Sequence, residues 1–191
     1  MGDEKWILYN NVEQKKAWGK QNEPPPITPK ASLHSKKVMC IWWDWKVVLY
    51  YELFPENQTI STTKYCSQLD QQKAALNEKC LELINRKCII FRQDNTRPHA
   101  SLMTRQKLLQ LGWGVLIHPL YSPDTAPSDF HLFRSLQNSL NGKNFSSLEG
   151  CKRHLEQFWA QKDKKFWEDG IINLPEKWQK VVEQNGEYVV Q

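Results

Sequence analysis

Three aspartates, Asp3, Asp94 and Asp129, are candidate ligands for metal ions. Asp94 lies in the segment FRQDNTRPHA and Asp129 in PLYSPDTAPSDFHLF, and the 34 residues 95–128 separate the two. In both segments Pro and Asp follow an apolar stretch, as is typical where a strand or helix ends. Carboxylate oxygens that converge at such ends are the ligands that Mg²⁺ and Mn²⁺ prefer. The pattern therefore favours a site for hard divalent cations.

The surroundings of Asp94 and Asp129 also allow structural roles. Asp94 follows the apolar segment 88–91, and ligands bind at the carboxyl ends of strands in α/β sheets. Its alternative role is an Asx turn before Asn95. A helix expected to begin at Ser128 gives Asp129 the same face as apolar residues at spacings of four, seven and eleven, which directs it toward the sheet. Its alternative is a first-turn acid that interacts favourably with the helix dipole, and both roles are compatible.

Asp3 carries less information on sequence alone, because Glu4 is its neighbour. Adjacent side chains of a strand face opposite ways, so only one of the two points at a common site. Two further acids are rivals, and we expect both to be structural. Asp44 lies in a strand or hairpin, and Asp124 lies in a turn after Pro123.

The order of three segments resembles the catalytic domain of mariner-type transposases over almost the whole chain. They are GDEKW (2–6), QDNTRPH (93–99) and YSPDTAPSDFHLF (121–133). The resemblance implies an α/β, ribonuclease H-like fold with a mixed five-stranded sheet flanked by helices, and it selects Asp3 rather than Glu4. It also implies that Asp3, Asp94 and Asp129 hold Mg²⁺ or Mn²⁺, as a pair of ions about 3.5 to 4 Å apart.

The same resemblance implies a metal-dependent DNA endonuclease and strand transferase. Such a protein cleaves phosphodiester bonds at the ends of a mobile element and joins the freed 3′-hydroxyl groups to a TA target. Two other functions stay open: a catalytically degenerate domain kept for DNA binding or dimerisation, and a ribonuclease for RNA:DNA hybrids, which rests on fold analogy. Arg92 departs from the family pattern, and its positive charge two residues from Asp94 is expected to lower metal affinity.

Basic residues are candidate DNA contacts, because phosphates supply most non-specific DNA affinity. The net charge of +5 is compatible with a nucleic-acid partner without being diagnostic of one. Residues 1–37 hold seven lysines against four acids, although a solvated Lys-rich loop would show the same composition. The candidate contacts are Lys15, Lys16, Lys20, Lys30, Lys36, Lys37, Arg97, His99 and Arg134. The expected partners are double-stranded DNA and a second copy of the chain in a homodimer.

Composition excludes several classes of protein. The five cysteines are odd in number and contain no CxxC pair, which argues against a disulfide framework and a structural zinc site. No run approaches the ~18 apolar residues of a membrane span, and we expect no signal peptide. We expect a nuclear protein with no membrane partner and no small-molecule cofactor.

The length of 191 residues predicts one domain, residues 1–191. The helix-turn-helix modules of the family are not expected in this chain. A Pro/Lys-rich loop at 14–37 would, by resemblance, reach toward the partner subunit and DNA. Strands are expected at 5–11, 38–45, 47–54, 88–91 and 115–117, the second and third as a hairpin, and the last two with a helix between them as a parallel βαβ unit. Helices are expected at 59–78, 98–111, 128–140, 146–161 with a Ser146/Glu149 capping box, 166–169 and 175–182.

Overall fold

The computed structural model describes residues 1–11, 36–55, 58–79 and 89–187. Its strands are β1 (Gly2–Leu8), β2 (Lys36–Trp43), β3 (Val48–Leu53), β4 (Ile90–Arg92) and β5 (Gly114–Leu116). Its helices are α1 (Thr62–Lys79), α3 (Arg97–Ala100), α4 (Leu102–Leu111), α5 (Arg134–Leu140), α6 (Leu148–Ala160), α7 (Lys164–Ile172) and α8 (Leu174–Glu183). A 3₁₀ turn, η1 (Pro123–Thr125), and a π-helical segment, η2 (Ser128–Phe133), precede α5. None of the described helices is long and apolar enough to cross a membrane.

The strands form two hydrogen-bonded ladders. β1 pairs antiparallel with β2, and β2 pairs antiparallel with β3. β4 and β5 pair in parallel, with α3 and α4 between them along the chain. The predicted hairpin and parallel βαβ unit are confirmed. The single mixed sheet is not: among the described residues the ladders are one sheet of three strands and another of two.

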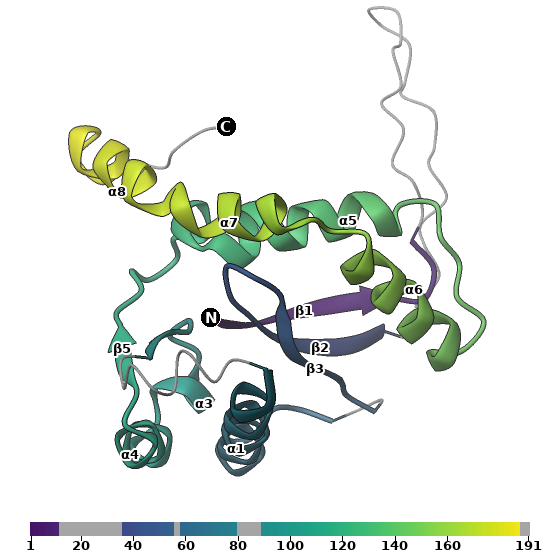
Figure 1. Cartoon of the computed structure of the whole chain (residues 1–191), viewed down its shortest axis with the longest axis horizontal. Coiled ribbons are helices and arrows are strands. Elements are labelled where there is room, and N and C mark those ends of the chain that lie inside the picture. The colour runs from purple at the N-terminus through teal and green to yellow at the C-terminus, as the bar shows by residue number, and fades with distance from the viewer. Residues whose placement is uncertain (12–35, 56–57, 80–88, 188–191) are drawn as a thin grey trace, which may run out of the picture.

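Alternate residues of the central strand β2 face two separate cores. Ile41 and Trp43 pack against α5, α6 and α7, whereas Cys40 and Trp42 pack against α1 and α4. All four are fully buried, so β2 runs as a continuous apolar strand covered on both faces. Figure 1 shows the result: α5 and α7 lie on one side of the strands and α1 lies on the other.

Two local starts differ from the sequence prediction. β1 begins at Gly2, not at residue 5, and therefore includes Asp3. The expected helix 128–140 begins as the π-helical η2, with Pro127 and not Ser128 at its N-cap position. The Ser128 hydroxyl instead accepts a buried hydrogen bond from Trp43 Nε1 at 3.1 Å. Because Trp43 belongs to the central strand, this bond fixes the start of η2 against the sheet.

Helix ends follow capping chemistry, with one correction. Ser101 interrupts the expected helix 98–111, and its hydroxyl accepts a bond from Thr104 N at the start of α4. Gly112 ends α4 in the left-handed conformation at φ 71°, as predicted. At α6 the capping residue is Ser147, which accepts from Gly150 N, so the predicted Ser146/Glu149 box is wrong by one residue.

The predicted loop at 14–37 lies outside the described residues except for its last two positions. Those two, Lys36 and Lys37, are the first residues of β2.

Candidate metal centre

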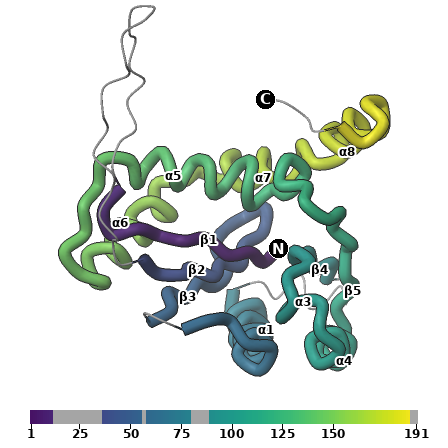
Figure 2. Tube along the Cα trace, turned by 180° about the vertical axis from the view of Figure 1, so that it is seen from behind, coloured from purple at the N-terminus to yellow at the C-terminus, as the bar shows by residue number. Residues whose placement is uncertain are grey.

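A small pocket lies where the N-terminal end of β1, the end of β4 and the start of η2 meet. Figure 2 shows the start of β1 beside β4 and α3. The pocket has a volume of about 20 Å³, which is room for about one water molecule or one monatomic ion. Its lining residues are Met1, Gly2, Asp3, Arg92, Gln93, Asp94, His118, Ala126, Pro127 and Ser128. Two of the three predicted aspartates therefore share one pocket, and the third directly follows its last lining residue.

Asp3 is half-buried within β1. Burial raises the pKa of its carboxyl group well above the ordinary range, and the negative charges of Asp129 and Glu4 raise it further. A hydrogen bond of 2.8 Å, donated by the backbone N of Glu4 to Asp3 Oδ1, opposes this effect without cancelling it. Like charges that crowd in this way favour a bound cation.

Asp94 follows β4, and one of its two carboxylate oxygens is fully occupied. Oδ1 accepts hydrogen bonds from Thr96 N at 3.0 Å and from Thr96 Oγ1 at 2.9 Å, and it also contacts His99 Nδ1. The Asx-turn role predicted as an alternative is thus present. Burial alone would raise the pKa of Asp94, but the bond and charge of His99 and the bonds from Thr96 outweigh burial and lower it. Asp94 is therefore ionised at neutral pH, and no described residue donates to its Oδ2.

Asp129 lies in the first turn of η2, and the residue is exposed. Partial desolvation of its carboxylate raises the pKa; the charge of Asp94 adds to this, whereas Lys5 and Arg92 oppose it. Asp129 therefore interacts electrostatically with both other aspartates, although it does not line the pocket. The residues present fit a divalent cation. The three acids interact with one another, the pKa values of Asp3 and Asp129 are raised, and Oδ2 of Asp94 accepts no hydrogen bond from a described residue.

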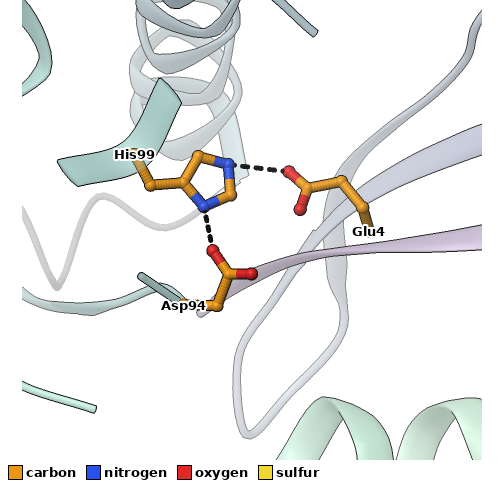
Figure 3. Close-up of side chains that lie close together, drawn as sticks. All are labelled: Glu4, Asp94 and His99. Carbon is orange, nitrogen blue, oxygen red and sulfur yellow. Dashed lines mark hydrogen bonds and ion pairs between the residues drawn. The ribbon is translucent and has the colours of Figure 1, made fainter. Parts of the chain in front are cut away.

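The sequence prediction missed Glu4 as a member of this region. One ligand atom each of Glu4, Asp94 and His99 lies within 4.8 Å of the other two (Figure 3). Only the tertiary fold brings residue 4 to residue 99; the available signal was that Glu4 is adjacent to a predicted ligand. His99 itself was expected to contact DNA, but it is 1% exposed. Its imidazole has no surface to offer a phosphate in this conformation.

Arg92 places a positive charge beside the acids. The residue is 5% exposed, and its Nη2 lies 2.6 Å from His118 Nδ1. Its guanidinium carbon lies 5.9 Å from the centre of the Trp178 ring. Burial lowers the pKa of Arg92 to about 10, while the charges of Asp3 and Asp129 oppose that shift. The guanidinium therefore remains charged at neutral pH.

The other predicted DNA contacts divide into three groups. Lys15, Lys16, Lys20 and Lys30 lie outside the described residues. Lys36 stacks its ammonium 4.3 Å from the centre of the Trp6 ring, and Lys37 is 8% exposed, which does not fit a surface contact. Arg97 and Arg134 are exposed, and their contact with DNA stays a prediction.

Comparisons with known proteins give the same reading as the sequence segments. A family described as "Transposase (partial DDE domain)" matches residues 8–86. The Mariner Mos1 transposase of Drosophila mauritiana is 40% identical over 190 residues, which are 98% of this chain and 55% of that protein. The Histone-lysine N-methyltransferase SETMAR of Homo sapiens is 41% identical over 187 residues, 97% of this chain and 27% of SETMAR. The chain thus spans about half of one relative and about a quarter of the other.

Solved structures show the class of fold. The crystal structure of the catalytic domain of Mos1 mariner transposase aligns with a TM-score of 0.83 and 38% identity, over 99% of this chain and 82% of that one. The Mos1 mariner paired end complex with Mn aligns with a TM-score of 0.90 and 38% identity, over 99% of this chain and 56% of that one. The molecule has the ribonuclease H-like fold of a transposase catalytic domain. This chain belongs to the mariner transposase family.

Proposed function

We propose that this chain is a divalent-metal-dependent DNA endonuclease and strand transferase, with its ions held by Asp3, Asp94 and Asp129. One observation carries the proposal. Asp3 lies in β1, Asp94 follows β4 of the other sheet, and both line one ion-sized pocket, where burial and like charge raise the pKa of Asp3. A cation would relieve that repulsion, and Asp94 Oδ2 accepts no bond from a described residue.

Descriptions of the relatives support the choice of ion and substrate. Solved Mos1 structures are described as a paired end complex with Mn, a paired end complex with Mg, a complex with the left transposon end and a Strand Transfer Complex. For this chain we infer Mg²⁺ or Mn²⁺ as the ion and double-stranded DNA as the substrate.

The residues divide the work by position. Asp3 and Asp94 would hold one ion in the pocket, and Asp129, in the first turn of η2, would contribute to holding a second one. Bound Mg²⁺ or Mn²⁺ lowers the pKa of a water ligand and stabilises the leaving oxygen. In cleavage a water oxygen bonds to phosphorus while the bond from phosphorus to the 3′-oxygen breaks, which leaves a 3′-hydroxyl and a 5′-phosphate. In joining, that 3′-hydroxyl oxygen bonds to a target phosphorus and displaces the 3′-oxygen of the target strand.

We further propose that the chain binds double-stranded DNA, forms a homodimer and acts in the nucleus. The exposed Arg97 and Arg134 flank the second and third aspartates along the chain and are suited to contact phosphates. A homodimer predicts a mass by light scattering near twice 22.6 kDa. A strictly monomeric chain at micromolar concentrations would remove the dimer from the proposal.

Plasmid nicking tests the catalytic proposal. We expect the chain to convert supercoiled plasmid to nicked circles in Mg²⁺ or Mn²⁺ and to lose this activity in EDTA. Asp94→Ala should abolish nicking. Asp70→Ala is the matched control, because Asp70 is exposed on α1 and pairs only with Lys107 among the described residues. Nicking that survives Asp94→Ala would contradict the proposal.

A second candidate, a domain that binds DNA or dimerises without chemistry, is favoured by one observation. The charge of Arg92 lies beside the acids and opposes cation binding. Unchanged plasmid at high protein concentration, together with retained DNA binding in a mobility-shift assay, would select this function over the first.

A further inference from the structure

The imidazole of His99 is buried, and several contacts hold it in place beside Asp94. It stacks on the Tyr65 ring with a centroid separation of 3.9 Å. The Tyr65 hydroxyl donates to Gln93 Oε1 at 2.7 Å, and Gln93 Nε2 donates to the backbone carbonyl of His99 at 3.0 Å. Contacts therefore hold both the ring and the backbone of this residue. With 1% of its surface exposed, His99 has little freedom to adopt another rotamer.

The two ring nitrogens of His99 serve different carboxylates. Nδ1 contacts Asp94 Oδ1, whereas Nε2 lies 2.9 Å from Glu4 Oε1 (Figure 3). The second contact is an ion pair whose direction does not reach hydrogen-bond alignment. One cation cannot use both nitrogens, because they point away from each other across the ring. A cation between Nδ1 and Asp94 would also have no space, since those atoms are already in contact. Glu4, Asp94 and His99 are therefore better explained as a chain of contacts than as a second metal site.

The contact with His99 helps to fix the orientation of the Asp94 carboxylate. Oδ1 has three neighbouring donors, one from His99 and two from Thr96. A carboxylate oxygen that already accepts these bonds is poorly available to an ion, and the planar group then fixes where its other oxygen lies. Glu4 is adjacent to Asp3 on β1, so the same contacts also tie the strand that carries the first aspartate to the segment that carries the second.

We propose that His99, held by Glu4, is a positioning residue that occupies Oδ1 of Asp94 and thereby presents Oδ2 to the divalent ion. The inference rests on the proposed function, because it assumes that Asp94 binds an ion. Partners that orient ligating carboxylates typically change metal affinity by about 10- to 100-fold when they are removed. His99 itself touches neither the ion nor the DNA.

Two substitutions of His99 separate its two contacts. The amide nitrogen of Asn lies near the place of Nδ1, so His99→Asn keeps the donor to Asp94 and loses the contact with Glu4. The amide nitrogen of Gln lies near the place of Nε2, so His99→Gln keeps the contact with Glu4 and loses the donor to Asp94. The two variants differ by one methylene and have the same charge, which makes each a control for the other.

The measurement is the dissociation constant for Mn²⁺, obtained by electron paramagnetic resonance on the full chain without DNA. We expect His99→Gln to bind about 10- to 100-fold more weakly than wild type. His99→Asn keeps the donor to Asp94 but loses the contact with Glu4, so its affinity should lie between that of His99→Gln and that of wild type. Melting in EDTA checks that both variants fold. Equal affinity in the two variants, whether retained or lost, would overturn the proposal. Asp94→Asn distinguishes failure of the positioning role of His99 from failure of the proposed function. If wild type binds no Mn²⁺, or if Asp94→Asn binds Mn²⁺ as tightly as wild type does, the proposed function itself is wrong.

A second pair of variants decides the matter if substitutions of the buried histidine do not fold. Glu4 is partly exposed, and Glu4→Ala removes the group that faces Nε2, whereas Glu4→Gln keeps an acceptor oxygen there. Weaker Mn²⁺ binding in Glu4→Ala that is restored in Glu4→Gln supports the positioning role. Wild-type affinity in Glu4→Ala would overturn it.

Discussion

Asp3 and Glu4 are consecutive residues of β1 whose side chains lie on opposite faces of the sheet. Asp3 lies opposite Ile41, which belongs to the core under α5, α6 and α7, and Glu4 lies opposite Cys40, which belongs to the core under α1 and α4. Directly opposed residues of antiparallel strands share a face. Asp3 is therefore on the side of η2 and Asp129, and Glu4 is on the side of His99. Asp3 is thus a candidate ligand, and its neighbour Glu4 contacts His99, which in turn contacts the candidate ligand Asp94.

Gly2 has no room for a side chain, which makes it a test of how closely β1 approaches the second core. A Cβ at this position would lie 2.5 Å from Trp42 Nε1 and 3.2 Å from Phe91 Cζ. Trp42 is fully buried, so we expect Gly2→Ala to lower the free energy of unfolding by about 1 to 3 kcal/mol in urea denaturation. Gly114→Ala is the control, because its Cβ would meet nothing closer than the Ile89 carbonyl oxygen at 3.8 Å. Equal stability of the two variants would show that β1 does not dock in this way.

Removal of the Arg92 charge should strengthen metal binding. A divalent ion in the pocket would be repelled by the guanidinium, and repulsion over several ångströms in a partly buried site amounts to at least about tenfold in affinity. We expect Arg92→Met to lower the Mn²⁺ dissociation constant by that factor in calorimetric titration. Arg153→Met removes a charge from the exposed surface of α6 and should leave the constant unchanged. Unchanged or weaker binding in Arg92→Met would mean that Arg92 stabilises the pocket and does not oppose the ion.

The raised pKa of Asp3 predicts how the stability of the metal-free chain depends on pH. A carboxyl group with a higher pKa in the folded state binds its proton more tightly there than in the unfolded chain. Folding stability therefore falls as pH rises above the unfolded value of about 3.9, until the raised pKa is passed. In EDTA at pH 8 we expect Asp3→Asn to unfold at a higher temperature than wild type, with a smaller difference at pH 5. A wild-type chain that is the more stable of the two at pH 8 would refute the assigned direction.

The pKa of His99 is also raised, but in this case the partners of the side chain stabilise its charged form. Burial would lower its pKa, but its contacts with Asp94 and Glu4 raise it to about 9. Its stabilising contribution is complete below the unfolded value of about 6.5 and is lost as pH rises through about 9. The free energy of unfolding of wild type should therefore decrease between pH 6.5 and pH 9.5 more than that of His99→Asn. Parallel curves from chemical denaturation would contradict the raised pKa.

Much of the fold could be predicted from the sequence, because local signals agree with the tertiary structure. Three signals are local, because each depends on only a few neighbouring residues. They are the apolar run of β2, Gly112 after α4 and the apolar residues before Asp94. The start of β1 could not be predicted in the same way. Gly2 and Asp3 have poor strand propensity, and pairing with the buried strand β2 outweighs that preference. At α6, Ser146 and Ser147 are equally good caps by residue type, and only the path of the chain selects the second.

The three aspartates of the candidate site could be predicted from the sequence, but the residues that position them could not. Residue type and order single out Asp3, Asp94 and Asp129, but nothing local indicates that His99 is buried between two carboxylates. A histidine five residues from a proposed ligand resembles a phosphate contact in the sequence, and only the fold places Tyr65 and Glu4 around it. Arg92 shows the same limit: its charge was visible in the sequence, and its burial beside Asp3 was not.

A crystal soaked in Mn²⁺ would show whether Asp3 and Asp94 hold an ion between them, because anomalous scattering locates the ion without reference to activity. We expect a peak in the pocket between Asp3 and Asp94, about 2.0 to 2.3 Å from an oxygen of each, with Asp94 contributing Oδ2. A peak found only at Glu4 and His99, or an empty pocket at saturating Mn²⁺, would contradict this expectation.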